Sequence, residues 1–134
     1  MREIKCLMVM PMHTPQVTTL EVSMEAFSKA VSIGSEEDLR LTAKKIGKRT
    51  YILYAADALF AELAANRKVD GEIISGTFYV VAVDKERILV SLSEEQMMRY
   101  MMMFYEPERY SGKEVISNWC HCAIKEFESM AMGR

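Results

Sequence analysis

The chain has 134 residues, half of them hydrophobic and 27% charged, and its formal net charge is −2. This length suits one domain with a core of its own, and so small a charge argues against both a nucleic-acid-binding protein and an acidic DNA mimic. Three cysteines, two of them separated by one residue, give no disulfide framework, so we expect a cytoplasmic protein. No apolar run approaches the roughly 20 residues of a membrane span.

The first elements in chain order are a strand and a helix. Residues 4–10 form a compact apolar run that ends at a proline, which is typical of a buried strand followed by a rigid loop. Residues 18–35 repeat apolar side chains at helical spacing. They predict an amphipathic helix with Thr19 or Ser23 as its N-cap and Gly34 as its stop.

The middle of the chain predicts two β regions separated by a short helix. Residues 39–46 alternate in polarity and residues 50–54 are rich in β-prone side chains, which together indicate a hairpin. The alanine-rich residues 55–66 suit a short helix, with an extended turn as the alternative. Residues 73–83 form the strongest strand pattern in the chain, with Gly76 as an expected bulge or site of close backbone approach.

The last third predicts a short strand and two helices. Residues 88–92 return as a strand, and Ser93 with Gln96 forms a capping-box pattern that starts a methionine-rich helix. Pro107 ends that helix, and Ser111 caps a final amphipathic helix. The apolar face of the final helix consists of Ile116, Trp119, Cys120, Ala123, Phe127 and Met130.

Hairpins in the middle and helices towards the two ends predict an α+β fold. We expect a small, mostly antiparallel sheet of about four to five strands, packed by an N-terminal helix and two C-terminal helices. Residues 1–110 would form the domain. Residues 111–134 would form an amphipathic helix that packs either on this domain or at an oligomer interface.

A set of short motifs follows a fixed order along residues 3–110. The motifs are the Pro-x-x-x-Pro loop at Pro11–Pro15, Asn66-Arg67, the acidic-Ile-Ile-x-Gly-Thr-Phe strand at Glu72–Phe78, Ser91–Ser93, and Phe-x-x-Pro-Glu at Phe104–Glu108. This ordered set resembles the domain-of-unknown-function family 3846, small uncharacterised proteins of phages, plasmids and conjugative elements of Firmicutes and Actinobacteria. The resemblance implies a fold and a mobile-element setting, and it implies no reaction.

Two segments depart from the family pattern. Relatives usually carry Asn-Glu-Glu-Gly-Lys after the strand that residues 50–54 match, and this chain carries residues 55–59 (AADAL) there instead. A polar binding turn in relatives would therefore be largely lost here. The helix from Ser111 onward has no counterpart in the family pattern.

Asn66, Arg67 and Thr77 are the candidates for binding a small ligand. A guanidinium offers five donors in a fixed fork that suits a carboxylate or a phosphate. The structural alternative places Asn66 at a helix end and pairs Arg67 with Asp70 or Glu72.

The run Cys120-His121-Cys122 is expected to hold no metal. Cysteines at positions i and i+2 of a helix point about 200° apart, so they do not chelate one ion. Neighbours at i and i+1 do not face each other, which argues against a Cys-His nucleophile. We expect two packed cysteines and a surface histidine, and we predict no catalytic residue and no cofactor.

The methionine-rich helix is apolar on nearly every side, whereas one small sheet covers a single face. We expect core packing first, with the excess serving as a partner or self-association surface. The predicted interface residues are Met97, Met98, Met101, Met102, Tyr105 and Trp119.

The sequence favours a non-enzymatic protein-binding accessory module of a phage or mobile element. Its expected partner is a host defence or regulatory protein, or a second copy of the chain in a homo-oligomer, and not a membrane. The alternative is a small-ligand or nucleotide-binding domain that uses Asn66 and Arg67. A nucleic-acid binder comes third, because it requires residues 40–49 to form a basic patch.

Overall fold

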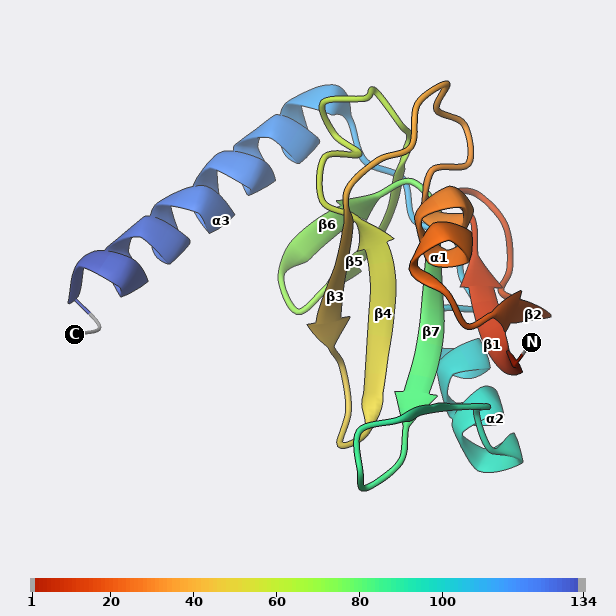
Figure 1. Ribbon diagram of the computed structural model, residues 1–134. Helices are drawn as coiled ribbons and strands as arrows, with labels where there is room; N and C mark the ends of the chain where they lie inside the picture. Colours follow the sequence, from red (N-terminus) through yellow and green to blue (C-terminus); the bar gives the residue numbers. More distant parts are fainter. Residues whose placement is uncertain (1, 133–134) are drawn as a thin grey trace.

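The computed structural model describes residues 2–132, which form eight strands in two antiparallel sheets and three helices (Figure 1). The main sheet has the order β2-β1-β7-β4-β3, with β8 paired to β7, and the small sheet pairs β5 with β6. The α+β class is confirmed, with more strands than expected. The elements are β1 (Glu3–Val9), β2 (Gln16–Glu21), α1 (Met24–Val31), β3 (Leu41–Lys45), β4 (Thr50–Ala55), β5 (Ala65–Val69), β6 (Glu72–Ser75), β7 (Phe78–Val83), β8 (Leu89–Val90), α2 (Glu94–Met103) and α3 (Gly112–Met132).

The predicted helix over residues 18–35 is wrong at its start, because the chain first forms β2. This strand pairs antiparallel with β1, with Thr18 opposite Cys6. α1 begins only after Ser23, whose Oγ accepts a hydrogen bond from the amide of Ala26 at 3.0 Å. The β-branched residues of β2 suit a strand, and β1 supplies the backbone partners that helical periodicity does not reveal.

Residues 55–66, all of which the structure describes, contain no helix, contrary to the prediction. After β4 the chain turns through residues 56–62 and enters β5 at Ala65. The Asp57 carboxylate accepts a hydrogen bond from the amide of Arg40 at 3.1 Å, and Ala58 is buried in the core. Helix propensities differ by only about 0.7 kcal/mol per ordinary residue, so these tertiary contacts decide the conformation.

The predicted strand over residues 73–83 is two strands that belong to different sheets. Gly76 lies between β6 and β7 with a φ of +78°. L-residues rarely adopt this conformation, and a Cβ at Gly76 would lie 3.0 Å from Cδ1 of Leu63. Gly76 is therefore a corner between two sheets and not a bulge within one strand.

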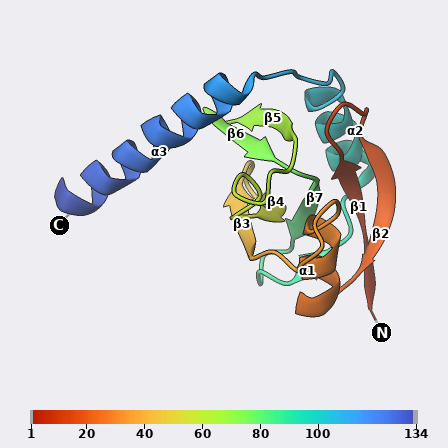
Figure 2. The ribbon, with the colours of Figure 1, turned by 90° about the horizontal axis from the view of Figure 1, so that it is seen from above.

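The main sheet buries both of its faces (Figure 2). The small sheet and α2 cover one face, in a cluster of Leu7, Val9, Ile52, Val69, Ile74, Phe78, Val80, Ala82, Leu92, Tyr100 and Phe104. α1 covers the other face, in a cluster of Ile4, Cys6, Phe27, Val31, Leu39, Leu53, Ala55, Ala58, Tyr79 and Val81. The alternation of side chains along β1 and β7 supplies both clusters.

The two C-terminal helices lie at opposite ends of the molecule (Figures 1 and 2). α2 begins at the predicted capping box, in which Ser93 Oγ accepts from the amide of Gln96 and Gln96 Oε1 accepts from the amide of Ser93. α3 starts near the small sheet and extends away from both sheets. Within residues 2–132, no helix combines the length and the apolar character that crossing a membrane requires.

Candidate functional site

Asn66 and Arg67 lie side by side in β5 and are fully buried. The pairing of β5 with β6 shifts its register between Ala65 and Arg67. A bulge of this kind breaks the normal alternation, so two consecutive side chains can both turn inward. The expectation that Asn66 ends a helix is therefore wrong.

The guanidinium of Arg67 is surrounded by oxygen atoms of the protein itself. Nε and Nη2 both donate to the backbone oxygen of Phe104, at 3.2 and 2.6 Å. Nη2 also donates to the oxygen of His13 at 2.7 Å, and Nη1 donates to Met10 O at 3.4 Å and Asn66 Oδ1 at 2.8 Å. These bonds occupy all five N–H groups of the side chain.

Arg67 therefore does not pair with Asp70 or Glu72, as the structural alternative supposes. Burial lowers the pKa of Arg67, and the negative charge of Glu108 acts in the opposite direction. An arginine stays charged in spite of such a shift, so backbone oxygens take the place of water around a buried cation. This arrangement ties the loop after β1 and the end of α2 to β5.

Asn66 connects the same region to the corner between the sheets. Its Nδ2 donates to the oxygens of Val9 and Gly76, both at 2.8 Å. Thr77 is buried beside this corner. The structure brings the three ligand candidates Asn66, Arg67 and Thr77 together, but it directs the donors of Asn66 and Arg67 at the protein backbone.

α2 divides its side chains between core and surface. Tyr100 and Phe104 are buried, and Met97 and Met101 pack against the same cluster. The ring of Phe104 meets that of Phe78 edge-on at 5.1 Å. Two of the predicted interface residues, Met97 and Met101, thus contribute mainly to the core.

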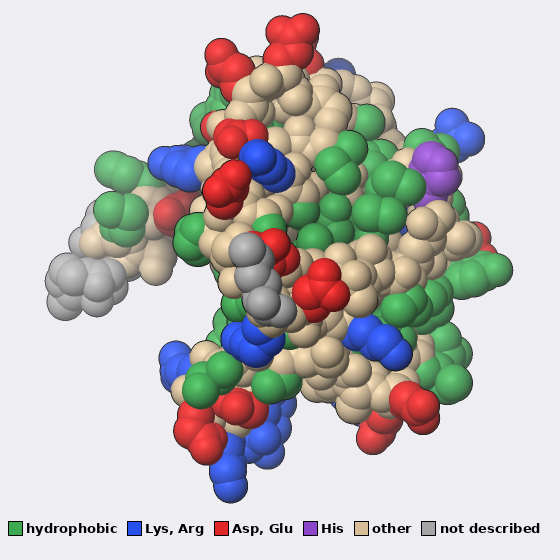
Figure 3. Space-filling view, turned by 45° about the vertical axis from the view of Figure 1, so that its right-hand side comes forward, with side chains coloured by type: hydrophobic (Ala, Val, Ile, Leu, Met, Phe, Trp, Pro, Cys, Tyr) green, Lys and Arg blue, Asp and Glu red, His purple; other side chains and the backbone are tan. Residues whose placement is uncertain are grey.

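The other side of α2, with the residue after its C-cap, exposes apolar side chains around one arginine. Met98, Met102, Met103 and Tyr105 are 54–72% exposed. Arg99 lies among them, and its guanidinium is 3.8 Å from the carboxylate of Glu95. In Figure 3, hydrophobic side chains gather on the lower right, at the height that α2 occupies in Figure 1. We call Met98, Arg99, Met102, Met103 and Tyr105 the α2 surface.

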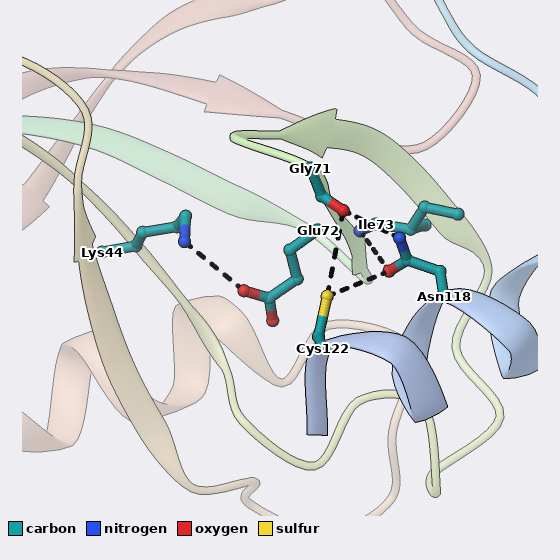
Figure 4. A network of polar contacts seen from close by, with 6 residues as sticks. All are labelled: Lys44, Gly71, Glu72, Ile73, Asn118 and Cys122. Carbon is teal, nitrogen blue, oxygen red and sulfur yellow. Dashed lines mark hydrogen bonds and ion pairs between the residues drawn. The ribbon is translucent and has the colours of Figure 1, made fainter. Parts of the chain in front are cut away.

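α3 attaches to the small sheet through the side chain of Asn118 (Figure 4). Asn118 Oδ1 accepts from the amide of Ile73 at 2.9 Å, and Nδ2 donates to the oxygen of Gly71 at 2.8 Å. The side-chain amide thus pairs with the edge of β6 as a neighbouring strand would. The thiol of Cys122 also lies 3.8 Å from Gly71 O.

A small cavity lies beneath this attachment, between β4, β6 and α3, and has a volume of about 50 Å³. Burial and the charges of Glu72 and Glu126 raise the pKa of Tyr54, which lines the cavity, to about 12. Ligand pockets usually measure about 300–1,000 Å³. This cavity has room for a few water molecules and is too small for a nucleotide.

The apolar face of α3 is largely exposed. Val115 is the one buried residue among residues 112–130. Cys120 is exposed and Cys122 is half-buried, which corrects the expectation of two packed cysteines. Trp119, the remaining predicted interface residue, is 46% exposed and its ring meets that of Phe60 edge-on at 5.5 Å.

The sequence gives no clear signal for the roles of two residues near α3, Asn118 and Phe60. Asn118 resembles any polar residue on the solvated side of a helix, and its role depends on where the edge of β6 lies. Phe60 falls in a segment that predicts a helix, which hides its place beside Trp119. A detectable signal was the spacing of apolar residues along α3, which indicates one continuous stripe.

The protein is thus an α+β domain with a buried polar centre at Arg67 and with two separate apolar surfaces on its C-terminal helices. The chain belongs to the family described as Domain of unknown function (DUF3846), which matches residues 4–105. The predicted resemblance is confirmed, and the match ends before α3. No curated protein and no solved structure matches the chain.

Proposed function

We propose that the protein is a non-enzymatic binding module that recognises another protein through the α2 surface. The observation that carries this proposal is the division of α2. Its core-facing side chains are packed in the domain, whereas three methionines and a tyrosine on the opposite side are exposed. A soluble domain rarely leaves such residues together without a use for them.

The chemistry of the α2 surface suits a protein partner. Methionine, tyrosine and arginine are enriched at protein interfaces, and methionine adapts its shape to irregular partners. The contact of Arg99 with Glu95 is long, at 3.8 Å, and the Arg99 side chain is 61% exposed, so it is available to an acidic group of a partner. The capping box holds the helix in place before any partner binds.

The wider setting of this activity is part of the proposal. The family resemblance supports an accessory role in a phage or another mobile element, in the cytoplasm of a bacterial host. A host defence or regulatory protein is the partner that this role requires. Interference with that protein would follow from occupying one of its own binding surfaces.

The ligand-binding alternative is weakened by the geometry around Arg67. A phosphate or carboxylate would have to displace the oxygens of Phe104, His13 and Met10 from the guanidinium. The same contacts favour a structural role for Asn66 and Arg67, so we do not propose a small-molecule site there.

A tagged pull-down from a nuclease-treated lysate of a bacterial host, read by mass spectrometry, tests the proposal. We expect one stoichiometric host protein with the wild type, and its loss with the double variant Met98→Glu/Met102→Glu. Both methionines are exposed, so the variant should fold. Glu94→Gln, on the first turn of the same helix, is the matched control. Equal capture by all three proteins would contradict the proposal.

A further inference from the structure

The second half of α3 has no cover from its own domain. Asn118 and Cys122, which attach the helix to β6, lie in its first half. Every residue from Ile124 to Met130 is exposed, and the helix extends away from both sheets (Figure 1). In proteins most helical stability comes from packing an amphipathic face, so a surface that covers this half would stabilise it.

The exposed side of α3 has the spacing of a helix-pairing surface. Its apolar stripe comprises Ile116, Cys120, Ala123, Phe127 and Met130, which follow one another at alternating steps of four and three residues. This is the pattern by which two helices interlock side chains along a common seam. The stripe lies away from Asn118 and Cys122, so pairing leaves the attachment to β6 intact.

A second apolar feature lies beside the first half of the same helix. The rings of Phe60 and Trp119 meet edge-on, with an interplanar angle of 88°, and both side chains remain accessible. They widen the apolar surface beside the first half of α3, and we call this pair of rings the Phe60–Trp119 platform. The second half of α3 exposes the apolar stripe without such a neighbour.

The exposed apolar area approaches what a stable dimer needs. The large side chains of the stripe and of the Phe60–Trp119 pair, which are Phe60, Ile116, Trp119, Phe127 and Met130, are 46–71% exposed. A large side chain offers roughly 150–250 Å², so the exposed parts of these five amount to about 600 Å². A standard interface buries about 800 Å² per partner, so these side chains supply most of what one requires.

We infer that α3 pairs antiparallel with α3 of a second copy of this chain. In this arrangement the second half of each α3 lies on the Phe60–Trp119 platform of the other copy. A two-fold axis relates the two copies, so both platforms are covered in the same way. The helix dipoles also oppose each other favourably. A parallel pair would leave both second halves remote from Phe60. This inference is independent of the α2 surface, which lies at the other end of the molecule.

The solution mass at a series of protein concentrations, measured by sedimentation equilibrium, tests the pairing. We expect a dimer for the wild type, and dissociation at least about thirtyfold stronger for Phe127→Glu, as for an aromatic anchor of an interface. Phe60→Glu, which alters no residue of α3, should also weaken the dimer. Lys125→Glu on the opposite face of α3 is the matched control and should leave it unchanged.

Disulfide trapping tests the orientation, because the alternating spacing places Cys120 of one copy opposite Ala123 of the other in an antiparallel pair. In a Cys122→Ser background, Ala123→Cys should therefore form an interchain disulfide with Cys120 on oxidation, whereas Cys120 alone should not. In a parallel pair Cys120 would face Cys120 and crosslink by itself.

A monomer at all concentrations would overturn the inference, and so would a dimer that survives both Phe127→Glu and Phe60→Glu. Efficient crosslinking through Cys120 alone would overturn the antiparallel arrangement. Loss of the host protein with the α2 variants bears on the proposed function alone, so the two failures are distinguishable.

Discussion

The guanidinium of Arg67 donates two hydrogen bonds to the backbone oxygen of Phe104, the residue that caps the C-terminus of α2. The end of a helix carries a partial negative charge, so it is a favourable place for a buried cation. Phe104 also packs its ring on Phe78 of β7. One residue thus joins the helix that carries the α2 surface to both sheets.

Removing the side chain of Arg67 should destabilise the protein strongly. Arg67→Met would remove every side-chain donor to the oxygens of Phe104 and His13, and would leave Met10 O with the amide of His13 alone. We therefore expect a loss of about 3–5 kcal/mol in the free energy of unfolding. The measurement is equilibrium unfolding in urea. Arg99→Met is the matched control, since the Arg99 side chain is 61% exposed, and it should change stability by about 0.5 kcal/mol or less. Equal losses would show that Arg67 has no special structural role.

Substitution of Asn118 should release α3 from the domain without unfolding the sheets. Asn118→Asp keeps the acceptor for the amide of Ile73 but replaces the donor to Gly71 O with a charged oxygen, at a cost of about 1–3 kcal/mol. Hydrogen exchange should therefore accelerate at Ile73 and along α3, while β4 and β7 stay protected. Ser117→Ala, at the exposed neighbouring position, should leave the exchange rates unchanged. Uniform acceleration in all elements would contradict this prediction.

Alanine substitutions at the two glycines that flank β6, Gly71 and Gly76, should distinguish the cost of backbone strain from the cost of steric crowding. Both have positive φ, but a Cβ at Gly71 meets no atom within 4 Å, whereas at Gly76 it meets Leu63 at 3.0 Å. We expect Gly71→Ala to cost about 1–2 kcal/mol for its left-handed backbone. Gly76→Ala should cost a further 1–3 kcal/mol or so for overpacking. Thermal unfolding of the two variants gives the comparison, and equal costs would mean that Leu63 moves away freely.

Alkaline conditions should weaken the protein through Cys6. Burial raises the pKa of this thiol from 9.0 to about 12. The associated stabilisation is fully present below pH 9 and is lost as the pH rises to about 12, because the unfolded thiol ionises first. Urea unfolding between pH 8 and pH 11 should show a decline that is shallower in Cys6→Ala. The same pH dependence in both proteins would assign the decline to other groups, among them Tyr79, whose pKa burial and Cys6 also raise to about 12.

The sequence marked Asn66 and Arg67 as an important pair but did not reveal what they bind. Their side chains become neighbours of Phe104, His13 and Gly76 only through the bulge in β5 and the return of α2 onto the sheet. Those contacts span 10 to 54 residues of chain. A local pattern carries no information about such distant partners.

Local signals held where the physical cause is local. The capping box at Ser93 lies within one helical turn, and the hairpin of β3 and β4 depends on adjacent residues. They failed at residues 18–21 and 55–66, where pairing with β1 or packing in the core outweighed small differences in propensity. The strand over residues 73–83 was recognised, but its division at Gly76 required the second sheet.

The sequence by itself therefore determined the family, the α+β class, the start of α2 and the existence of an apolar face on α3. Only the tertiary structure decided that Arg67 is enclosed by backbone oxygens and that the face of α3 is left exposed. The physical reason is that periodicity shows which side of a helix avoids water, whereas the surface that covers this side is set by contacts between distant parts of the chain.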